Sequence, residues 1–253
     1  MTSPLTWSLS HGVVAFPDAH HLHSVERVVR TSDAYERPPK EGETLVVVLG
    51  GTHDLYAGSG SWAQRGTRAT PFDGRACALY VPGRTPMAAD GGGGELLFVE
   101  YRMPAPAKAA TPERKPMLPL AGSNKVYDGE RGDWVRLEDL PTSPEAVLPR
   151  RIPVRDVDGV RVEDVFAPDY KAAVGSLLEF VLQDGVELTL PPPAHAREVA
   201  VVYSTRGKLT IEGRDDGGQR DGVVFGDARP LRMRSDGGPT YVAVAFGGPK
   251  SQT

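Results

Sequence analysis

Short apolar runs that end at glycine or proline form the first clear pattern in the chain. In the N-terminal part these runs lie at Leu45–Leu49, Asp54–Ala57, Ala76–Val81 and Leu96–Tyr101. Short strands bounded by turn residues at regular spacing are typical of antiparallel sandwiches and barrels. The pattern therefore predicts a small β-barrel in this part of the chain.

A second block, residues 160–248, repeats the same rhythm. Its expected strands are Ser176–Leu182, Val186–Leu190, Val199–Tyr203, Lys208–Glu212, Val223–Phe225, Leu231–Arg234 and Tyr241–Phe246. Within one of these runs Leu209 and Ile211 alternate with polar residues, as in a half-buried strand. Apart from a possible turn at Asp169–Val174, no segment shows an extended helical period. The two blocks predict an all-β chain with two tandem antiparallel β-barrels.

A stretch rich in proline separates the two blocks. It carries scattered charges and one short amphipathic piece, Trp134–Leu140. Such a composition predicts a connection that lies on the surface and is partly ordered. The expected organisation is an N-terminal barrel over residues 1–104, a Pro-rich connection over residues 105–157 and a C-terminal barrel over residues 158–250.

Composition narrows the class of partner. The chain has 253 residues, with 29 Lys and Arg against 33 Asp and Glu, and a net charge of −4. This balance argues against binding to duplex nucleic acid, which depends on neutralising phosphates. The apolar runs are far shorter than the roughly 20 residues of a membrane span. The N-terminus lacks the basic and apolar regions of a secretory signal. We therefore expect a cytoplasmic protein with no nucleic-acid or membrane partner.

Several segments resemble the cupins. Glu43–Gly50 is similar to the second half of the first cupin motif, and Tyr80–Met87 is similar to the turn of the second. A closer resemblance is to the bicupin family of 5-deoxy-glucuronate isomerase and 5-keto-4-deoxyuronate isomerase. That resemblance is carried by Gly60–Phe72, Arg161–Pro168 and Pro191–Glu198. It implies a bicupin fold of jelly-roll type and a sugar-isomerase activity.

The metal-binding pattern of this family is incomplete here. The family holds its metal in the second barrel through a Pro-Pro-His-x-His segment, a glutamate on the next strand and a later histidine. The corresponding segment keeps only His195, with Glu198 at the place of the glutamate, and no histidine follows. Cupin-type metal sites combine several imidazoles with a carboxylate, and the single cysteine, Cys77, adds no cysteine cluster. The sequence therefore predicts no metal and no other cofactor.

The same segment supplies the candidate catalytic residues. His195 follows three prolines, which stiffen the backbone, and an imidazole with an ordinary pKa of about 6.5 is suited to general-base catalysis. Glu198 opens an apolar strand and would be a buried carboxylate if it faces inward. Arg197, Arg161 and Tyr203 are candidates for binding an acidic substrate, because arginine grips carboxylates. The alternative is a rim histidine beside a surface Glu–Arg pair.

A histidine cluster near the N-terminus offers a different site. In the run His20–His23, His21 and His23 alternate along one strand face and would bind a metal if they reach a common ion. The alternative is a polar surface or interface segment. Structural roles are expected for three residues of the first block: Trp62, Arg65 and Arg68.

These features lead to two main functional hypotheses. The first is an isomerase-like enzyme that acts by acid–base chemistry without a metal, through isomerisation, epimerisation, dehydration or cyclisation. Its substrate would be a small polar molecule derived from a sugar or from secondary metabolism. The second is a non-catalytic bicupin that binds a small molecule or a partner protein. A polar interior in the second barrel would favour the enzyme, and an apolar one the binding module. Exposed edge strands also predict a homodimer.

Overall fold

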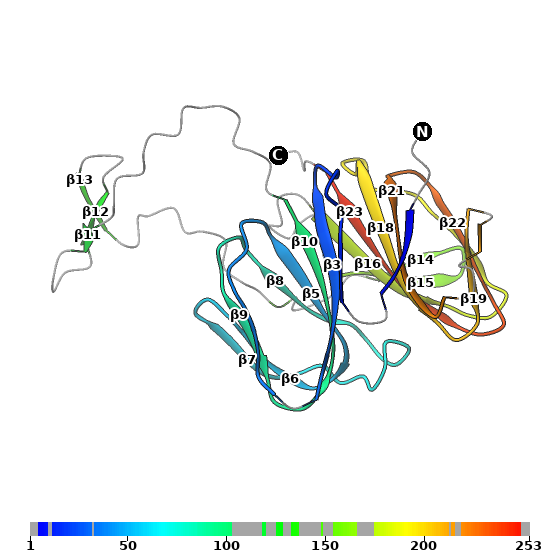
Figure 1. Ribbon diagram of the computed structural model, residues 1–253, viewed down its shortest axis with the longest axis horizontal. Coiled ribbons are helices and arrows are strands. Elements are labelled where there is room, and N and C mark those ends of the chain that lie inside the picture. Colours follow the sequence, from blue (N-terminus) through cyan, green and yellow to red (C-terminus); the bar gives the residue numbers. More distant parts are fainter. Residues whose placement is uncertain are drawn as a thin grey trace.

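The computed structural model describes residues 5–9, 12–31, 33–102, 118–119, 125–128, 133–136, 148, 154–165, 175–212, 214–215 and 219–248. These residues form strands and connecting turns, so the all-β prediction is confirmed (Figure 1). No helix long and apolar enough to cross a bilayer occurs in this part of the chain.

The N-terminal half is a sandwich of two antiparallel sheets. The first is five-stranded, in the order β2 (Gly12–Ala15), β3 (Leu22–Arg30), β10 (Gly94–Tyr101), β5 (Thr44–Gly51) and β8 (Cys77–Val81). The second is four-stranded, in the order β4 (Tyr35–Arg37), β9 (Met87–Asp90), β6 (His53–Ala57) and β7 (Gly60–Arg65). We call this unit the N-terminal sandwich.

The C-terminal half repeats the arrangement with larger sheets. Its seven-stranded sheet has the order β1 (Leu5–Ser8), β21 (Asp221–Asp227), β18 (Glu198–Thr205), β23 (Thr240–Gly247), β16 (Gly175–Leu182), β15 (Val160–Asp164) and β14 (Val154–Val157). Its four-stranded sheet has the order β17 (Glu187–Leu190), β22 (Leu231–Asp236), β19 (Lys208–Ile211) and β20 (Arg214–Asp215). We call this unit the C-terminal sandwich. Each half is thus built from two open antiparallel sheets, in agreement with the two tandem antiparallel units of jelly-roll type that the sequence predicted.

The strand β1 belongs to the large sheet of the C-terminal half, although it precedes the N-terminal sandwich in the sequence. It pairs with β21 of the C-terminal sheet, with Leu5 opposite Phe225 and Ser8 opposite Gly222. In Figure 1 this dark-blue strand lies among the strands of the C-terminal half. Leu5–Ser8 therefore form an edge strand of the large sheet of the second half.

The Pro-rich stretch contains a three-stranded antiparallel sheet. Its strands are β11 (Leu118–Pro119), β12 (Lys125–Asp128) and β13 (Asp133–Arg136). The predicted amphipathic piece begins within β13, and its remainder lies outside the described residues. The possible turn at Asp169–Val174 also lies outside them.

The large sheets of the two halves pack against each other and are buried on both faces. In β10, Phe98 faces the interior of the N-terminal sandwich, whereas Leu97 and Val99 belong to a core cluster shared with the other half. In β18, Val201 faces the interior of the C-terminal sandwich, and Val202 belongs to the shared cluster. Burial on both faces explains why these strands are almost continuously apolar.

A buried ion pair joins the two halves inside the shared core. The guanidinium of Arg68 binds both carboxylate oxygens of Glu179, and its Nε donates to the carbonyl of Val48 at 2.9 Å. The hydroxyl of Tyr241 donates to Glu179 at 3.0 Å. Burial and the neighbouring carboxylate raise the pKa of Tyr241 well above its usual value, so its hydroxyl remains a donor. Arg68 thus has the structural role that the sequence predicted.

Candidate functional site

The structure places two of the sequence candidates, the catalytic candidate Glu198 and the binding candidate Tyr203, on opposite faces of β18. Glu198 shares its face with Ala200 and Val202, which pack toward the N-terminal half. Tyr203 shares its face with Val201, which packs inside the C-terminal sandwich. Tyr203 also lies five positions after Glu198 in the strand, which corresponds to roughly 17 Å along the chain. These two side chains therefore cannot contact the same small substrate.

Both carboxylate oxygens of Glu198 are engaged by backbone amides of the N-terminal segment. The amides of His20, His21 and Leu22 donate to it at 2.5, 2.9 and 2.9 Å. The side chain is 7 % exposed. Charge-assisted hydrogen bonds of this kind are strong, so Glu198 acts as an anchor for residues 20–22.

The other predicted binding residues do not converge on one point. Tyr203 is 1 % exposed within the apolar core, and its hydroxyl donates to Gln219 at 3.4 Å. Arg161 is exposed and pairs with Glu163 at 2.8 Å. The exposed Arg197 donates to the carbonyls of Ala194 and Ala196, within its own turn.

His195 occupies the turn before β18 and is half-buried. The amide of Ala196 donates to the carbonyl of Pro193 at 2.9 Å, which closes this turn. A side chain at Gly248 would clash with the carbonyl of His195 at 2.0 Å, so the turn lies directly against the end of β23. Of the five predicted residues, only His195 and Arg197 share this turn.

The interior of the C-terminal sandwich is filled by apolar side chains. Phe180, Leu188, Val201 and Met233 are among the buried members of this cluster. At one end, the hydroxyls of Thr205, Ser235 and Thr240 bond to one another at 2.7 and 2.8 Å. By the criterion set from the sequence, the second interior is plugged rather than polar-lined.

The described residues do not fit a metal site of the cupin type. Among them, no three His, Cys, Asp or Glu side chains are grouped closely enough to hold a metal ion. The oxygens of Glu198 are already committed to amides. The imidazole of His23 lies 3.9 Å from Glu100, whereas His21 lies against Gly247 of the other half. His21 and His23 therefore point to different parts of the molecule.

The interior of the N-terminal sandwich, in contrast, contains a charged cluster at one end. Arg37 at the end of β4 is 7 % exposed and pairs with Glu26 on β3 and Glu100 on β10. Its guanidinium lies 4.4 Å over the ring of Phe98. Because Glu100 shares the face of Phe98 on β10, these charges lie between the two sheets rather than in solvent. We call Arg37, Glu26 and Glu100 the charged cluster.

Hydroxyl groups complete the charged cluster. Ser24 donates to Glu100 at 2.6 Å, and the hydroxyl of Tyr35 donates to Glu26 at 3.4 Å. Burial and the charge of Glu26 raise the pKa of Tyr35. Burial alone would raise the pKa of Glu100, but the hydrogen bond from Ser24 and the charge of Arg37 outweigh it and lower that pKa. At neutral pH Glu100 is therefore a carboxylate beside the Arg37 cation, and the Tyr35 phenol keeps its proton.

A cavity lies beside this cluster, where strands of the four-stranded sheet begin or end. Its volume is 490 Å³, within the usual range for small-molecule sites. It is lined by Glu36, Arg37, Pro38, Tyr56, Ala57, Gly58, Pro86, Met87 and Ala88. Arg37 thus belongs both to the cavity wall and to the charged cluster. At the edge of the cluster, the ammonium of Lys40 is 46 % exposed and lies 3.9 Å from Glu100. We call this region the N-terminal mouth.

Sequence reasoning did not find the N-terminal mouth. Glu26 and Arg37 lie on β3 and β4, which were not predicted because their polar residues interrupt the apolar pattern. The sequence signal that could have identified β3 is the alternation of Ser24, Glu26, Val28 and Arg30. Alternate residues share one strand face, and most of these residues are polar.

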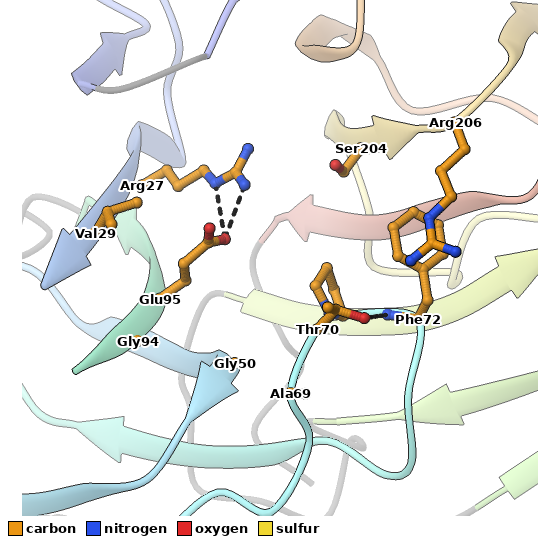
Figure 2. Close-up of a pocket in the computed structure, with 11 residues that line it drawn as sticks. Arg27, Val29, Gly50, Ala69, Thr70, Phe72, Gly94, Glu95, Ser204 and Arg206 are labelled. Atoms are coloured by element: carbon orange, nitrogen blue, oxygen red, sulfur yellow. Dashed lines mark hydrogen bonds and ion pairs between the residues drawn. The ribbon is translucent and has the colours of Figure 1, made fainter. Parts of the chain in front are cut away.

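A second pocket lies between the two halves (Figure 2). Its volume is 380 Å³, and it is lined by Arg27, Val29, Gly50, Ala69, Thr70, Pro71, Phe72, Gly94, Glu95, Ser204 and Arg206. Ser204 and Arg206 come from the C-terminal half and the other residues from the N-terminal half. We call it the inter-half pocket.

Comparison with known proteins reveals the fold but no sequence relative. No protein-family model matches the sequence, and no curated protein matches it. An IolB-like protein from Salmonella typhimurium LT2 superposes with a TM-score of 0.66 and 15 % identity, covering 99 % of this chain and 95 % of that one.

Two named enzymes share the same architecture. Oxalate decarboxylase from Bacillus subtilis has a TM-score of 0.61 and 12 % identity, covering 99 % of this chain and 78 % of that one. Quercetin 2,3-dioxygenase from Acinetobacter baumannii has a TM-score of 0.57 and 11 % identity, covering 99 % of this chain and 79 % of that one. The chain therefore has a bicupin fold, as predicted, while membership of the deoxyuronate isomerase family remains a prediction.

Proposed function

We propose that this bicupin is an isomerase-like enzyme that performs acid–base chemistry on a small acidic, polar substrate at the N-terminal mouth. The observation that carries the proposal is the double position of Arg37, which lines a 490 Å³ cavity and also pairs with two carboxylates. The location differs from the C-terminal segment that the sequence favoured, because Glu198 and Tyr203 are committed to structural contacts.

Arg37 has the chemistry to hold an anionic oxygen. A guanidinium is always protonated and carries five N–H donors. Its Nη1 donates to Glu26 and Tyr35, and its Nη2 donates to Glu100. No described atom accepts from its buried Nε. Donor capacity therefore remains for the carbonyl or carboxylate oxygen of a substrate.

Glu26 and Tyr35 supply the base and the acid. Glu26 takes a proton from the carbon next to the substrate carbonyl, and the enolate oxygen accepts hydrogen bonds from Arg37 and the Tyr35 phenol. In a substrate with a hydroxyl on that carbon, the Tyr35 phenol gives its proton to the enolate oxygen and takes one from the hydroxyl, and Glu26 returns its proton to the former carbonyl carbon, which gives the isomer. Positioned acid–base groups and fixed donors are the usual means of lowering such barriers.

Exchange of carbon-bound hydrogen with D2O tests this proposal even when the product has not been identified. The full chain is incubated with a panel of uronates and keto acids, and deuterium uptake is measured by mass spectrometry. We expect Glu26→Gln to lower the exchange rate at least a hundredfold and Tyr35→Phe to lower it about tenfold. Glu41→Gln is the matched control, because Glu41 forms an exposed pair with Arg84.

Two results would contradict the proposal. Exchange that survives in Glu26→Gln but is lost in His195→Ala would return the site to the C-terminal segment. A wild-type chain that exchanges none of the panel would favour the non-catalytic bicupin, which the plugged C-terminal interior also favours.

The oligomeric state remains a proposal of its own. Val13 on the edge strand β2 is 58 % exposed, and Val154 on the edge strand β14 is 46 % exposed. Apolar residues on exposed edges favour pairing with a second copy. Sedimentation of the full chain should give a dimer, and a monomer would refute this expectation.

A further inference from the structure

We propose that the inter-half pocket is a second ligand site, which binds a small hydroxylated molecule through a carboxylate or phosphate group. It is distinct from the N-terminal mouth, because the two sites share no lining residue. Its volume of 380 Å³ suits a molecule of metabolite size.

One side chain of the pocket, Arg206, favours an anion. The other guanidinium of the lining, Arg27, already pairs with Glu95 at 2.8 Å and with Asp221 at 2.7 Å. Arg206 is exposed, and none of the described carboxylates forms an ion pair with it. A carboxylate or phosphate is the natural partner of this guanidinium.

Arg206 is held in place for this role. Its guanidinium stacks 4.4 Å over the ring of Phe72 from the other half, as Figure 2 shows. Phe72 is itself fixed by a tight turn, in which its amide donates to the Thr70 hydroxyl at 3.3 Å and that hydroxyl donates to Asp73 at 2.6 Å. A cation whose position is fixed before binding loses less conformational freedom when the ligand arrives.

The hydroxyl groups of the pocket select for hydroxyls on the ligand. Ser204 uses its proton on Asp221 at 2.6 Å, and Thr70 uses its proton on Asp73. The oxygen of Ser204 can therefore act as an acceptor toward the pocket, and that of Thr70 has one lone pair beside the one that accepts from the Phe72 amide. A ligand that carries hydroxyl donors beside its anionic group matches this arrangement, as in a sugar acid or a sugar phosphate.

A ligand in this pocket would contact both halves of the molecule. Arg206 and Ser204 belong to β18 and the turn that follows it, whereas Phe72 and Thr70 belong to the N-terminal half. Because the ligand contacts both halves only when they are packed, binding must raise the unfolding temperature.

The experiment uses the full chain and four probes: sodium gluconate, glucose 6-phosphate, inorganic phosphate and glucose. Binding is measured by calorimetry and by the shift in melting temperature. We expect gluconate or glucose 6-phosphate to bind, the preferred one identifying the anionic group, and neutral glucose not to bind. Arg206→Gln should weaken binding at least tenfold, and Phe72→Leu should weaken it severalfold. Arg84→Gln is the matched control, because Arg84 is exposed and does not line the pocket.

The outcomes separate this site from the N-terminal mouth. Binding that persists in Tyr35→Phe and is lost in Arg206→Gln supports the inter-half pocket, whether or not the chain is an enzyme. Equal binding of gluconate by wild type and Arg206→Gln overturns the proposal, as does failure of both hydroxylated anions to bind. Binding of inorganic phosphate alone also overturns it, because the hydroxyl acceptors would then have no function.

Discussion

The interiors of the two sandwiches are filled by different kinds of side chain. Inside the C-terminal sandwich, Phe180 and Met233 belong to a continuous apolar cluster. Inside the N-terminal sandwich, the guanidinium of Arg37 lies over Phe98 and binds two carboxylates. Apolar side chains in an interior need no hydrogen-bond or ion-pair partner, whereas each buried charge is stabilised only while its partners are present. The stability of the N-terminal interior therefore depends on paired charges, whereas that of the C-terminal interior does not.

Breaking the charged cluster should have the largest effect. Arg37→Met leaves Glu26 and Glu100 without their cation, and removal of one partner from a buried pair costs about 3–5 kcal/mol. Urea unfolding at neutral pH measures this loss. The loss should shrink in acid, where the carboxylates take up protons and no longer need a counter-charge. A loss below about 1 kcal/mol would mean that solvent already screens the cluster.

A cavity in the C-terminal interior should cost slightly less and show no pH dependence. Met233 is fully buried, so Met233→Ala should lower the free energy of unfolding by about 2–5 kcal/mol. The matched measurement is the same urea titration at neutral and acidic pH. A pH-dependent loss would show that a titrating group lies close to Met233.

Removal of the charge at Glu198 should have an intermediate effect. Glu198→Gln keeps the size of the side chain but weakens three hydrogen bonds from residues 20–22. We expect a loss of about 1–3 kcal/mol, together with faster proteolysis in the N-terminal segment. Unchanged stability combined with lost deuterium exchange would instead support the catalytic role inferred from the sequence.

Acidification should also change the stability contributions of His53 and Asp164, one in each half, in opposite directions. This is the smallest expected effect. His53 in the N-terminal half is fully buried, accepts from Arg30 at Nδ1 and donates to Gly50 at Nε2. Burial and the nearby Arg30 lower its pKa, although the bond to Gly50 opposes this shift. The unfolded chain therefore binds the proton more readily, and this contribution to stability is lost as pH falls below about 6.5.

Asp164 in the C-terminal half acts in the opposite direction. Burial raises its pKa, and the charge of Arg155 only partly offsets this shift. The folded chain therefore binds this proton more readily, so acidification toward pH 4 stabilises the folded state through Asp164. Unfolding curves of His53→Gln and Asp164→Asn over this pH range separate the two contributions. Parallel pH profiles in both variants and the wild type would contradict the assignment.

Strands buried on both faces were the easiest part of the fold to predict. Runs such as Leu45–Leu49 and Tyr241–Phe246 carry enough apolar residues to identify them without any partner. The polar strands β3 and β4 were missed, because Glu26 and Arg37 face a charged interior that sequence patterns treat as solvent.

The face of the sheet on which Glu198 lies could not be predicted from the sequence, for the same reason that β18 was easy to find. Val199–Tyr203 is apolar at every position, so no alternation shows which side chains point into the sandwich. The partners of Glu198 are amides from residues 20–22 of the chain, and only the folded structure brings them together. The charges of the N-terminal mouth converge in the same way, from β3, β4 and β10.

The pairing of β1 with β21 bears on the order in which the molecule is assembled during synthesis. The sheets of the N-terminal sandwich use only residues 12–101, so this unit can form while later residues are still being translated. The strand Leu5–Ser8 is translated before Asp221–Asp227 and can pair with that strand only after it has been translated. Contacts of such long sequence separation form slowly, and an unpaired strand is prone to pair with other chains. A strand that is translated early thus belongs to a sheet that forms late, and the nascent protein must keep this strand unpaired until Asp221–Asp227 has been translated.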